Sequence, residues 1–208
     1  MGTADNGRQP VRSGRVLIER ATLRDITYIG AHLRQPDRDE IFCQLPEGTI
    51  GSVMAASVLA TVDPDWTWVA TIKDQPVCAF GFQAYSVPVW IGWAWGTDAM
   101  IRAIPAVTRH CLEQEQRLLD LGVRRVEVRT MKGHDVSQAW LGRLGCKYQC
   151  DLPDHGRDGE TFELWAWQLR DGLPSTNTSY RTKRNVLPQA SQGAEAGSAA
   201  LSPEQAGG

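Results

Sequence analysis

The sequence has little of what marks secreted, membrane-spanning or nucleic-acid-binding proteins. Its five cysteines are odd in number and widely scattered, which argues against a disulfide framework and favours reduced thiols. No stretch reaches the roughly 18 apolar residues of a membrane span, and the opening MGTADNGRQPVRSG lacks the apolar core of a signal peptide. The formal net charge is −2, so no general basic field attracts nucleic acid or a membrane, and neither is an expected partner.

Composition divides the 208 residues into three parts. Residues 1–14 are polar and are expected to form a flexible arm, and residues 15–170 are apolar enough to fold as one domain. Residues 171–208 form a low-complexity tail rich in Gly, Ala, Ser, Pro and Gln, which is expected to be disordered in isolation. Two interpretations of the tail stay open: a solvated linker, or a docking peptide anchored by residues 180–187 that orders on a partner.

The central part contains segments with the periodicity of strands and segments with the periodicity of helices. Strands are expected at 15–20, 66–72, 77–85, 89–94, 123–130, 147–152 and 161–169, the last two joined as a hairpin. The residues Thr22-Leu-Arg-Asp25 predict a capping box, followed by a helix with Ile26, Ile29 and Leu33 on its inner face.

Four further helices are expected between these strands. Gln35-Pro36 is expected to break the first helix, with a short helix at 37–45. The next is a helix capped by Thr49. A single helix is expected from Ile104 to Leu121, with Glu113 and Arg117 paired on its surface. The last is expected to be capped by Asp135 and to end at Gly145. The expected inner face of the helix capped by Thr49 is Ile50, Val53, Met54 and Val58. That of the helix from 104 to 121 is Ile104, Val107, Cys111 and Leu118, and that of the last helix is Val136, Ala139, Trp140 and Leu144.

The segment VPVWIGWAWGTDAMIRAIPA, residues 87–106, is a strand, a turn and the start of a helix. Such junctions bind phosphate when several backbone N–H groups of the first helical turn point at the anion and glycine allows close approach. This turn has one glycine, Gly96, and the helix start carries Pro105, which has no N–H to donate. The position is right for a cofactor loop, but the residues are poorly suited to it.

The order of elements over residues 15–169 resembles the GNAT superfamily of N-acetyltransferases. The opening VLIERATLRD resembles the first strand and helix of that family, and VRRVEVRT with the later WLGRLGCKY resembles its fifth strand and fourth helix. The resemblance implies an α+β fold, with a mixed and mostly antiparallel sheet of about six to seven strands flanked by about four helices.

The resemblance also implies where an acyl-CoA would bind and shows that the matching residues differ. The family holds the CoA pyrophosphate on a loop of the form Arg/Gln-x-x-Gly-x-Gly/Ala, and its catalytic tyrosine falls at Leu141 here. No asparagine follows the fifth strand, in residues 131–134. We therefore expect no catalytic residue and no cofactor, with acetyl-CoA as the alternative. The degenerate loop region is Gly96, Thr97, Arg102, Pro105 and Val107.

Weaker candidates each have a more ordinary interpretation. His134 and Glu127 are conceivable general bases, but one precedes a helix in a polar loop and the other belongs to a solvent-facing row. The tryptophans at 90, 93 and 95 are more typical of core packing than of a stacking platform. Cys146, Cys150 and His155 lack the fourth ligand and the spacing of a zinc site, so no metal is expected.

One branch of the superfamily is especially similar. GNAT-like proteins of short-tailed bacteriophages, related to the internal virion protein family, share three short motifs with this chain. Arg20-Ala21-Thr22 with Asp25 is the first, Trp95-Gly96-Thr97-Asp98 the second, and Trp140-Leu141-x-x-Leu144-Gly145 the third.

The phage resemblance implies a structural protein of the virion, located there and in the cytoplasm of the infected host. Its partners would be portal, adaptor, tail or internal proteins. Two hypotheses follow: a catalytically degenerate GNAT fold that binds neighbouring virion proteins, or an active acetyl-CoA-dependent N-acetyltransferase acting on a phage or host protein.

Overall fold

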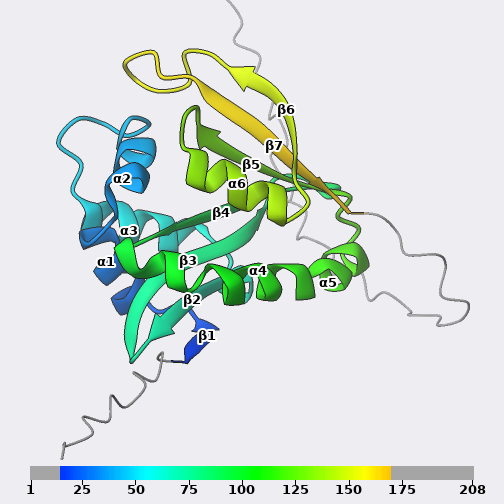
Figure 1. The fold of residues 1–208 in the computed structure, drawn as a ribbon, viewed down its shortest axis with the longest axis horizontal. Helices are drawn as coiled ribbons and strands as arrows, with labels where there is room; N and C mark the ends of the chain where they lie inside the picture. The colour runs from blue at the N-terminus through cyan, green and yellow to red at the C-terminus, as the bar shows by residue number, and fades with distance from the viewer. Residues whose placement is uncertain (1–14, 170–208) are drawn as a thin grey trace, which may run out of the picture. The chain divides into compact units, whose positions relative to one another are not determined.

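The structure, a computed structural model, describes residues 15–169. The arm expected at 1–14 and the tail expected at 171–208 lie outside these residues. The described part is built on one sheet of seven strands in the order β1-β2-β3-β4-β5-β7-β6 (Figure 1). The strands are β1 (Val16–Arg20), β2 (Thr67–Ile72), β3 (Gln75–Ala84), β4 (Val89–Gly96), β5 (Arg125–Met131), β6 (Lys147–Leu152) and β7 (Phe162–Gln168).

The sheet has an antiparallel half on each side of a single parallel junction. Strands β1 to β4 pair antiparallel with their neighbours, and so do β5, β7 and β6. Strands β4 and β5 run parallel and pair only where 89–91 face 125–127. Beyond that point the two strands diverge, so residues 92–96 of β4 have no strand partner on the β5 side. We call this gap the opening between β4 and β5.

Helices cover both faces of the sheet. One face carries α1 (Leu23–Ala31), α2 (Gln35–Phe42) and α3 (Gly51–Thr61), and the other carries α4 (Ile104–Glu113), α5 (Glu115–Asp120) and α6 (Asp135–Arg143) (Figure 1). Two short 3₁₀ helices, η1 (Pro64–Trp66) and η2 (Asp98–Arg102), precede β2 and α4. None of the described helices is long and apolar enough to cross a membrane.

Several local predictions are confirmed. The Thr22 side chain accepts from the backbone N–H of Asp25 and the Asp25 carboxylate accepts from that of Thr22, so the capping box is present. The predicted inner face of α1 is buried. Gly145 adopts a φ of 85°, the left-handed conformation that ends a helix, and the hairpin of β6 and β7 is formed.

Other helix predictions are wrong in their boundaries. Helix α2 begins at Gln35, because proline is tolerated in a first turn where its missing N–H would have no partner. Residue Ile50, not Thr49, occupies the N-cap position of α3, and the Thr49 hydroxyl donates to the carbonyl of Pro46. Asp135 is the first residue of α6 rather than its cap.

The expected single helix from 104 to 121 is two helices that meet at Gln114. Arg117 lies over the ring of Trp66 at 4.1 Å instead of pairing with Glu113. Three of the predicted inner faces are also partly wrong. Four expected core residues, Ile50, Val53, Val136 and Ala139, are exposed, and Ile104 is only partly buried. The periodicity located these helices, but it did not fix which face packs, because apolar side chains lie on more than one side.

Helices α1 and α3 touch through backbone. A Cβ added to Gly30 would lie 2.5 Å from the carbonyl oxygen of Gly51 and 2.8 Å from the Cβ of Ala55. Backbone atoms cannot swing aside as a long side chain can. We therefore expect Gly30→Ala to lower the free energy of unfolding by about 1–3 kcal/mol, measured by chemical denaturation.

Gly142→Ala is the matched control. Gly142 also lies in a helix, α6, and a Cβ there would meet nothing within 4 Å. It should raise stability by up to about 1 kcal/mol, since alanine favours the helix. Equal effects of the two substitutions would contradict the close α1–α3 contact.

Candidate functional site

The start of α2 satisfies the unpaired edge of β4. Asp37 accepts the backbone N–H of Gly96 at 2.7 Å, and the backbone N–H of Arg34 donates to the carbonyl of Gly96 at 2.9 Å. A buried backbone group without a partner is costly, so these two bonds replace the ladder that β5 no longer provides. The opening between β4 and β5 is closed at this point by side chains of the same chain.

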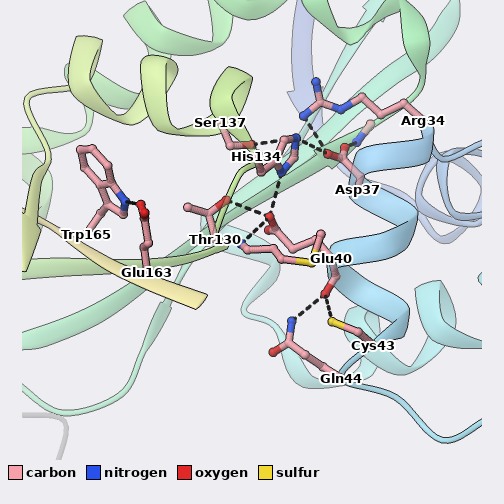
Figure 2. A network of polar contacts seen from close by, with 12 residues as sticks. Arg34, Asp37, Glu40, Cys43, Gln44, Thr130, His134, Ser137, Glu163 and Trp165 are labelled. Atoms are coloured by element: carbon pink, nitrogen blue, oxygen red, sulfur yellow. Dashed lines mark hydrogen bonds and ion pairs between the residues drawn. The ribbon is translucent and has the colours of Figure 1, made fainter. Parts of the chain in front are cut away.

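Arg34 and Asp37 form a buried ion pair one turn apart. Their closest atoms are 2.7 Å apart, and the two side chains are only 7% and 4% exposed. Removing either partner would leave a buried charge uncompensated. The pair therefore fixes the first turn of α2 against the end of β4 (Figure 2).

Glu40, one turn after Asp37 on α2, holds the end of β5. Its Oε2 atom accepts from the Thr130 hydroxyl at 2.8 Å and from the backbone N–H of Met131 at 2.9 Å. The same oxygen lies 2.8 Å from His134 Nδ1. Arg34, Asp37 and Glu40 are spaced by three residues, so they lie along one side of α2, toward the opening.

His134 completes what we call the buried polar cluster: Arg34, Asp37, Glu40, Thr130 and His134. The His134 side chain is 4% exposed, with Nε2 lying 3.8 Å from an oxygen of Asp37. Ser137 Oγ lies 3.2 Å from its Nδ1. Because His134 is the N-cap residue of α6, the cluster joins α2 to β4, β5 and α6 (Figure 2).

A cavity of about 300 Å³ lies between the diverging strands. Its walls are mainly apolar and come from β3, β4, β5, α2, α4 and α6, with Glu40 and Ser137 among the polar side chains. This volume is at the lower end of small-molecule sites in proteins. This cavity could not be predicted from sequence, because it depends on the divergence of two strands far apart in the chain.

Two thiols in the cavity wall are poor nucleophiles. Burial raises the pKa of Cys111 to about 12, with the neighbouring Cys146 adding to the effect. Burial likewise raises the pKa of Cys146 to about 11. Only the thiolate attacks, so both side chains act as small apolar groups near neutral pH.

The predicted cofactor loop is present, but most of its backbone N–H groups are already hydrogen-bonded within the chain or absent. The backbone N–H groups of Ala106 and Val107 both donate to the carbonyl of Ala103, because η2 leads directly into α4. Pro105 has no N–H, and Val107 is fully buried. A helix start binds an anion through free N–H groups, and few remain here.

The other loop residues have structural tasks. Gly96 is bonded to α2 through both its N–H and its carbonyl. The Thr97 side chain caps η2 by accepting from the backbone N–H of Ala99. Arg102 is exposed on η2.

The remaining candidates lie apart from one another. Glu127 pairs with Arg125 at 2.7 Å on the sheet surface. Trp90 and Trp95 are buried in the core, as predicted, with Trp93 partly buried beside Trp95. His134 is buried in the cluster, where the Glu40 carboxylate lies 2.8 Å from its Nδ1 and Asp37 lies 3.8 Å from its Nε2.

Four of the five cluster residues were missed from sequence: Arg34, Asp37, Glu40 and Thr130. The run Arg34-Gln-Pro-Asp37-Arg-Asp-Glu40 reads as a solvated stretch of charges, and its partners lie some 90 residues away at Thr130 and His134. The one available signal was the spacing of three between Arg34, Asp37 and Glu40. No group of three or more His, Cys, Asp or Glu placed to hold a metal ion occurs in residues 15–169.

No protein-family model matches the sequence, and no curated protein matches it either. Solved structures do match. An Ard1 protein from Thermoplasma volcanium is 12% identical over 75% of this chain and 99% of that one, with a TM-score of 0.59. A GNAT-family acetyltransferase from Bacillus anthracis is 12% identical over 76% and 96%, with a TM-score of 0.56. The ribosomal-protein-S18-alanine N-acetyltransferase of Escherichia coli is 12% identical over 80% and 100%, with a TM-score of 0.56.

These likenesses give the class of fold. The chain has the fold of GNAT acetyltransferases, with a seven-stranded and mostly antiparallel sheet, which confirms the predicted fold class. At this level of identity the match concerns architecture alone, so the activities of these enzymes are not carried over to this chain.

Substitution of Asp37 tests how much the buried polar cluster contributes to the stability of the protein. Asp37→Ala removes the partner of Arg34 and the acceptor of the Gly96 N–H, so it should lower the free energy of unfolding by about 3–5 kcal/mol. Asp39→Ala on the same helix is the control. Asp39 is exposed, and among the described residues its side chain bonds only to Gln35, so its loss should cost no more than about 0.5 kcal/mol. Chemical denaturation of both variants measures the difference, and similar losses would refute the central role of Asp37.

Proposed function

We propose that this chain is a non-catalytic binding protein built on the GNAT fold. The observation that carries the proposal is the closure of the opening between β4 and β5 by Arg34 and Asp37, directly beside the start of α4. An acyl-CoA held at the start of α4 would have to pass this point to place its acyl group in the cavity between the strands. The passage is occupied by a buried ion pair that is costly to break.

The start of α4 supports the same conclusion. Pro105 offers no donor, and the N–H groups of Ala106 and Val107 already bond within the chain. Each missing charge-assisted hydrogen bond costs about 1.5–3 kcal/mol, or a factor of about 10 to 100 in affinity. Leu141, at the position of the family's tyrosine acid, is 2% exposed in the core and has no proton to transfer.

We further propose that the binding role belongs to a bacteriophage particle. The support is the resemblance of three short motifs, around Arg20, Trp95 and Trp140, to GNAT-like proteins of short-tailed phages. The partners would be portal, adaptor, tail or internal virion proteins.

An active N-acetyltransferase is the second candidate, and one observation favours it. Glu40 lines the cavity, and its Oε1 atom makes no hydrogen bond with any described residue. A carboxylate beside an apolar cavity can accept a proton from an amine, which is the step that acetyl transfer requires.

Calorimetric titration with acetyl-CoA separates the two candidates. The non-catalytic proposal predicts no binding heat at millimolar acetyl-CoA and no acetyl transfer to a panel of peptide amines. An active GNAT enzyme measured with the same reagents is the positive control. A micromolar dissociation constant, or transfer that Glu40→Gln abolishes, would establish the acetyltransferase instead.

The proposed role in a bacteriophage particle is tested by a separate experiment. Phage particles purified from infected cells that express this chain should contain it in a fixed number of copies per portal, measured by quantitative mass spectrometry. A chain that stays in the cell lysate and is absent from washed particles would refute the virion role.

A further inference from the structure

The outward side of α3 is apolar although it faces solvent. Ile50 and Val53 are 60% and 55% exposed, against the prediction that they lie in the core. Three small residues that follow them along the helix are exposed as well. Their spacing of three and four residues places all five on one side of α3. We call this side the outer face of α3: Ile50, Val53, Ala56, Ser57 and Ala60.

The other side of α3 is already packed. Met54 and Ala55 are buried, and the backbone of Gly51 touches Gly30 of α1. The helix therefore carries apolar side chains on two sides, and a helix that is apolar all round is normally enclosed by protein. Rotating α3 cannot bury the outer face, because it would break the contact with Gly30.

Covering the outer face would leave no polar group without a partner. Every position from 48 to 62 is uncharged. The Ser57 hydroxyl donates to the carbonyl of Val53 at 3.0 Å, and the Thr61 hydroxyl beside it donates to that of Val58 at 2.9 Å. Both hydroxyls are satisfied within the helix, so a partner that excludes water here breaks no hydrogen bond.

The size of the side chains identifies the partner. The first half of the outer face is bulky, with Ile50 and Val53, and the second half is small, with Ser57 and Ala60. When two copies of α3 lie antiparallel about a twofold axis, the bulky half of each meets the small half of the other, as knobs meet holes. This direction also places opposite ends of the two helix dipoles side by side. A parallel pair would set bulky against bulky and leave a gap between the small halves.

We propose that the outer face of α3 binds the same face of a second copy of this chain, as a symmetric antiparallel helix pair. Helix α3 has 11 residues and is about 16 Å long, so the pair buries less than the roughly 800 Å² per partner of a standard interface. The dimer is therefore weak, with a dissociation constant of about 10⁻⁴ M. Helix α3 lies on the sheet face opposite to α4, so the proposal does not depend on acetyl-CoA binding or acetyl transfer.

Sedimentation equilibrium of the full chain, from about 10 µM to about 1 mM, should show a reversible equilibrium of monomer and dimer. Val53→Lys places two charges inside the antiparallel pair and should abolish association in this range. Val87→Lys is the matched control, because Val87 is 74% exposed and lies between β3 and β4, outside the outer face. It should leave the dissociation constant unchanged.

A size exchange tests the antiparallel direction. Ile50→Ala leaves a hole opposite the partner's Ala60, and Ala60→Ile collides with the partner's Ile50, so each should weaken the dimer about tenfold. The double variant exchanges the bulky and the small side chain and should restore the dissociation constant to within about threefold. Both positions are exposed in the monomer, so unfolding temperatures should change little and a loss of association is not a loss of fold.

Salt dependence separates an apolar interface from a charged one. The outer face contains no charge to screen, so raising the salt from about 50 mM to about 500 mM should not weaken the dimer. The nearest charged residues in the chain, Glu47 and Asp63, are both acidic. Any contact between them across an antiparallel pair is repulsive, and salt would tighten the dimer by screening it.

Three outcomes would overturn the proposal: a chain that stays monomeric at all concentrations, a dimer that Val53→Lys leaves intact, and a double variant as weak as the two single variants. A monomeric chain that loses its place in washed phage particles through Val53→Lys would assign the outer face to another protein, against this proposal. Binding of acetyl-CoA would refute the non-catalytic role and leave the dimer unaffected, so the two proposals fail separately.

Discussion

The hydrogen bond between Asp37 and the backbone of Gly96 is the contact on which the centre of this molecule depends. Strands β4 and β5 pair over three residues and then separate, which leaves backbone groups of β4 without the partners that a sheet normally gives. Asp37 supplies the missing acceptor, and it is in turn held ready by Arg34. The shape of the opening and the position of α2 both follow from this arrangement.

Closing the opening with charged side chains has a physical cost that a simple apolar plug would avoid. A buried ion pair rarely stabilises a protein more than well-packed apolar residues of the same size. Its benefit is specificity, since a hydrogen-bonded pair admits one register of α2 against β4 and β5, while an apolar contact can slide. In this chain the pair also leaves one donor atom, Arg34 Nε, without a partner. That atom has almost no accessible surface, so the protein itself encloses it.

Local chemistry predicted most of the fold, and long-range chemistry decided the site. The capping box at Thr22 and the glycine at 145 could be identified because each acts within a few residues. The strands at 147–152 and 161–169 were equally clear, since alternation and a glycine-rich turn specify a hairpin. The task of Glu40 could not be predicted, because its partners at 130, 131 and 134 are brought to it only by the completed sheet.

The long sequence separation between members of the buried polar cluster also implies that its contacts form late in folding. Strands β1 to β4 and helices α1 and α3 all lie in the first half of the described chain and contact each other extensively, so they can assemble without the second half. Helix α2 belongs to the same half, but Glu40 finds its partners only after β5 and α6 have been added. During synthesis the charged side of α2 therefore stays hydrated until the second half of the domain emerges. The late closure of α2 would place these contacts on the native side of the folding barrier, where they slow unfolding more than they speed folding.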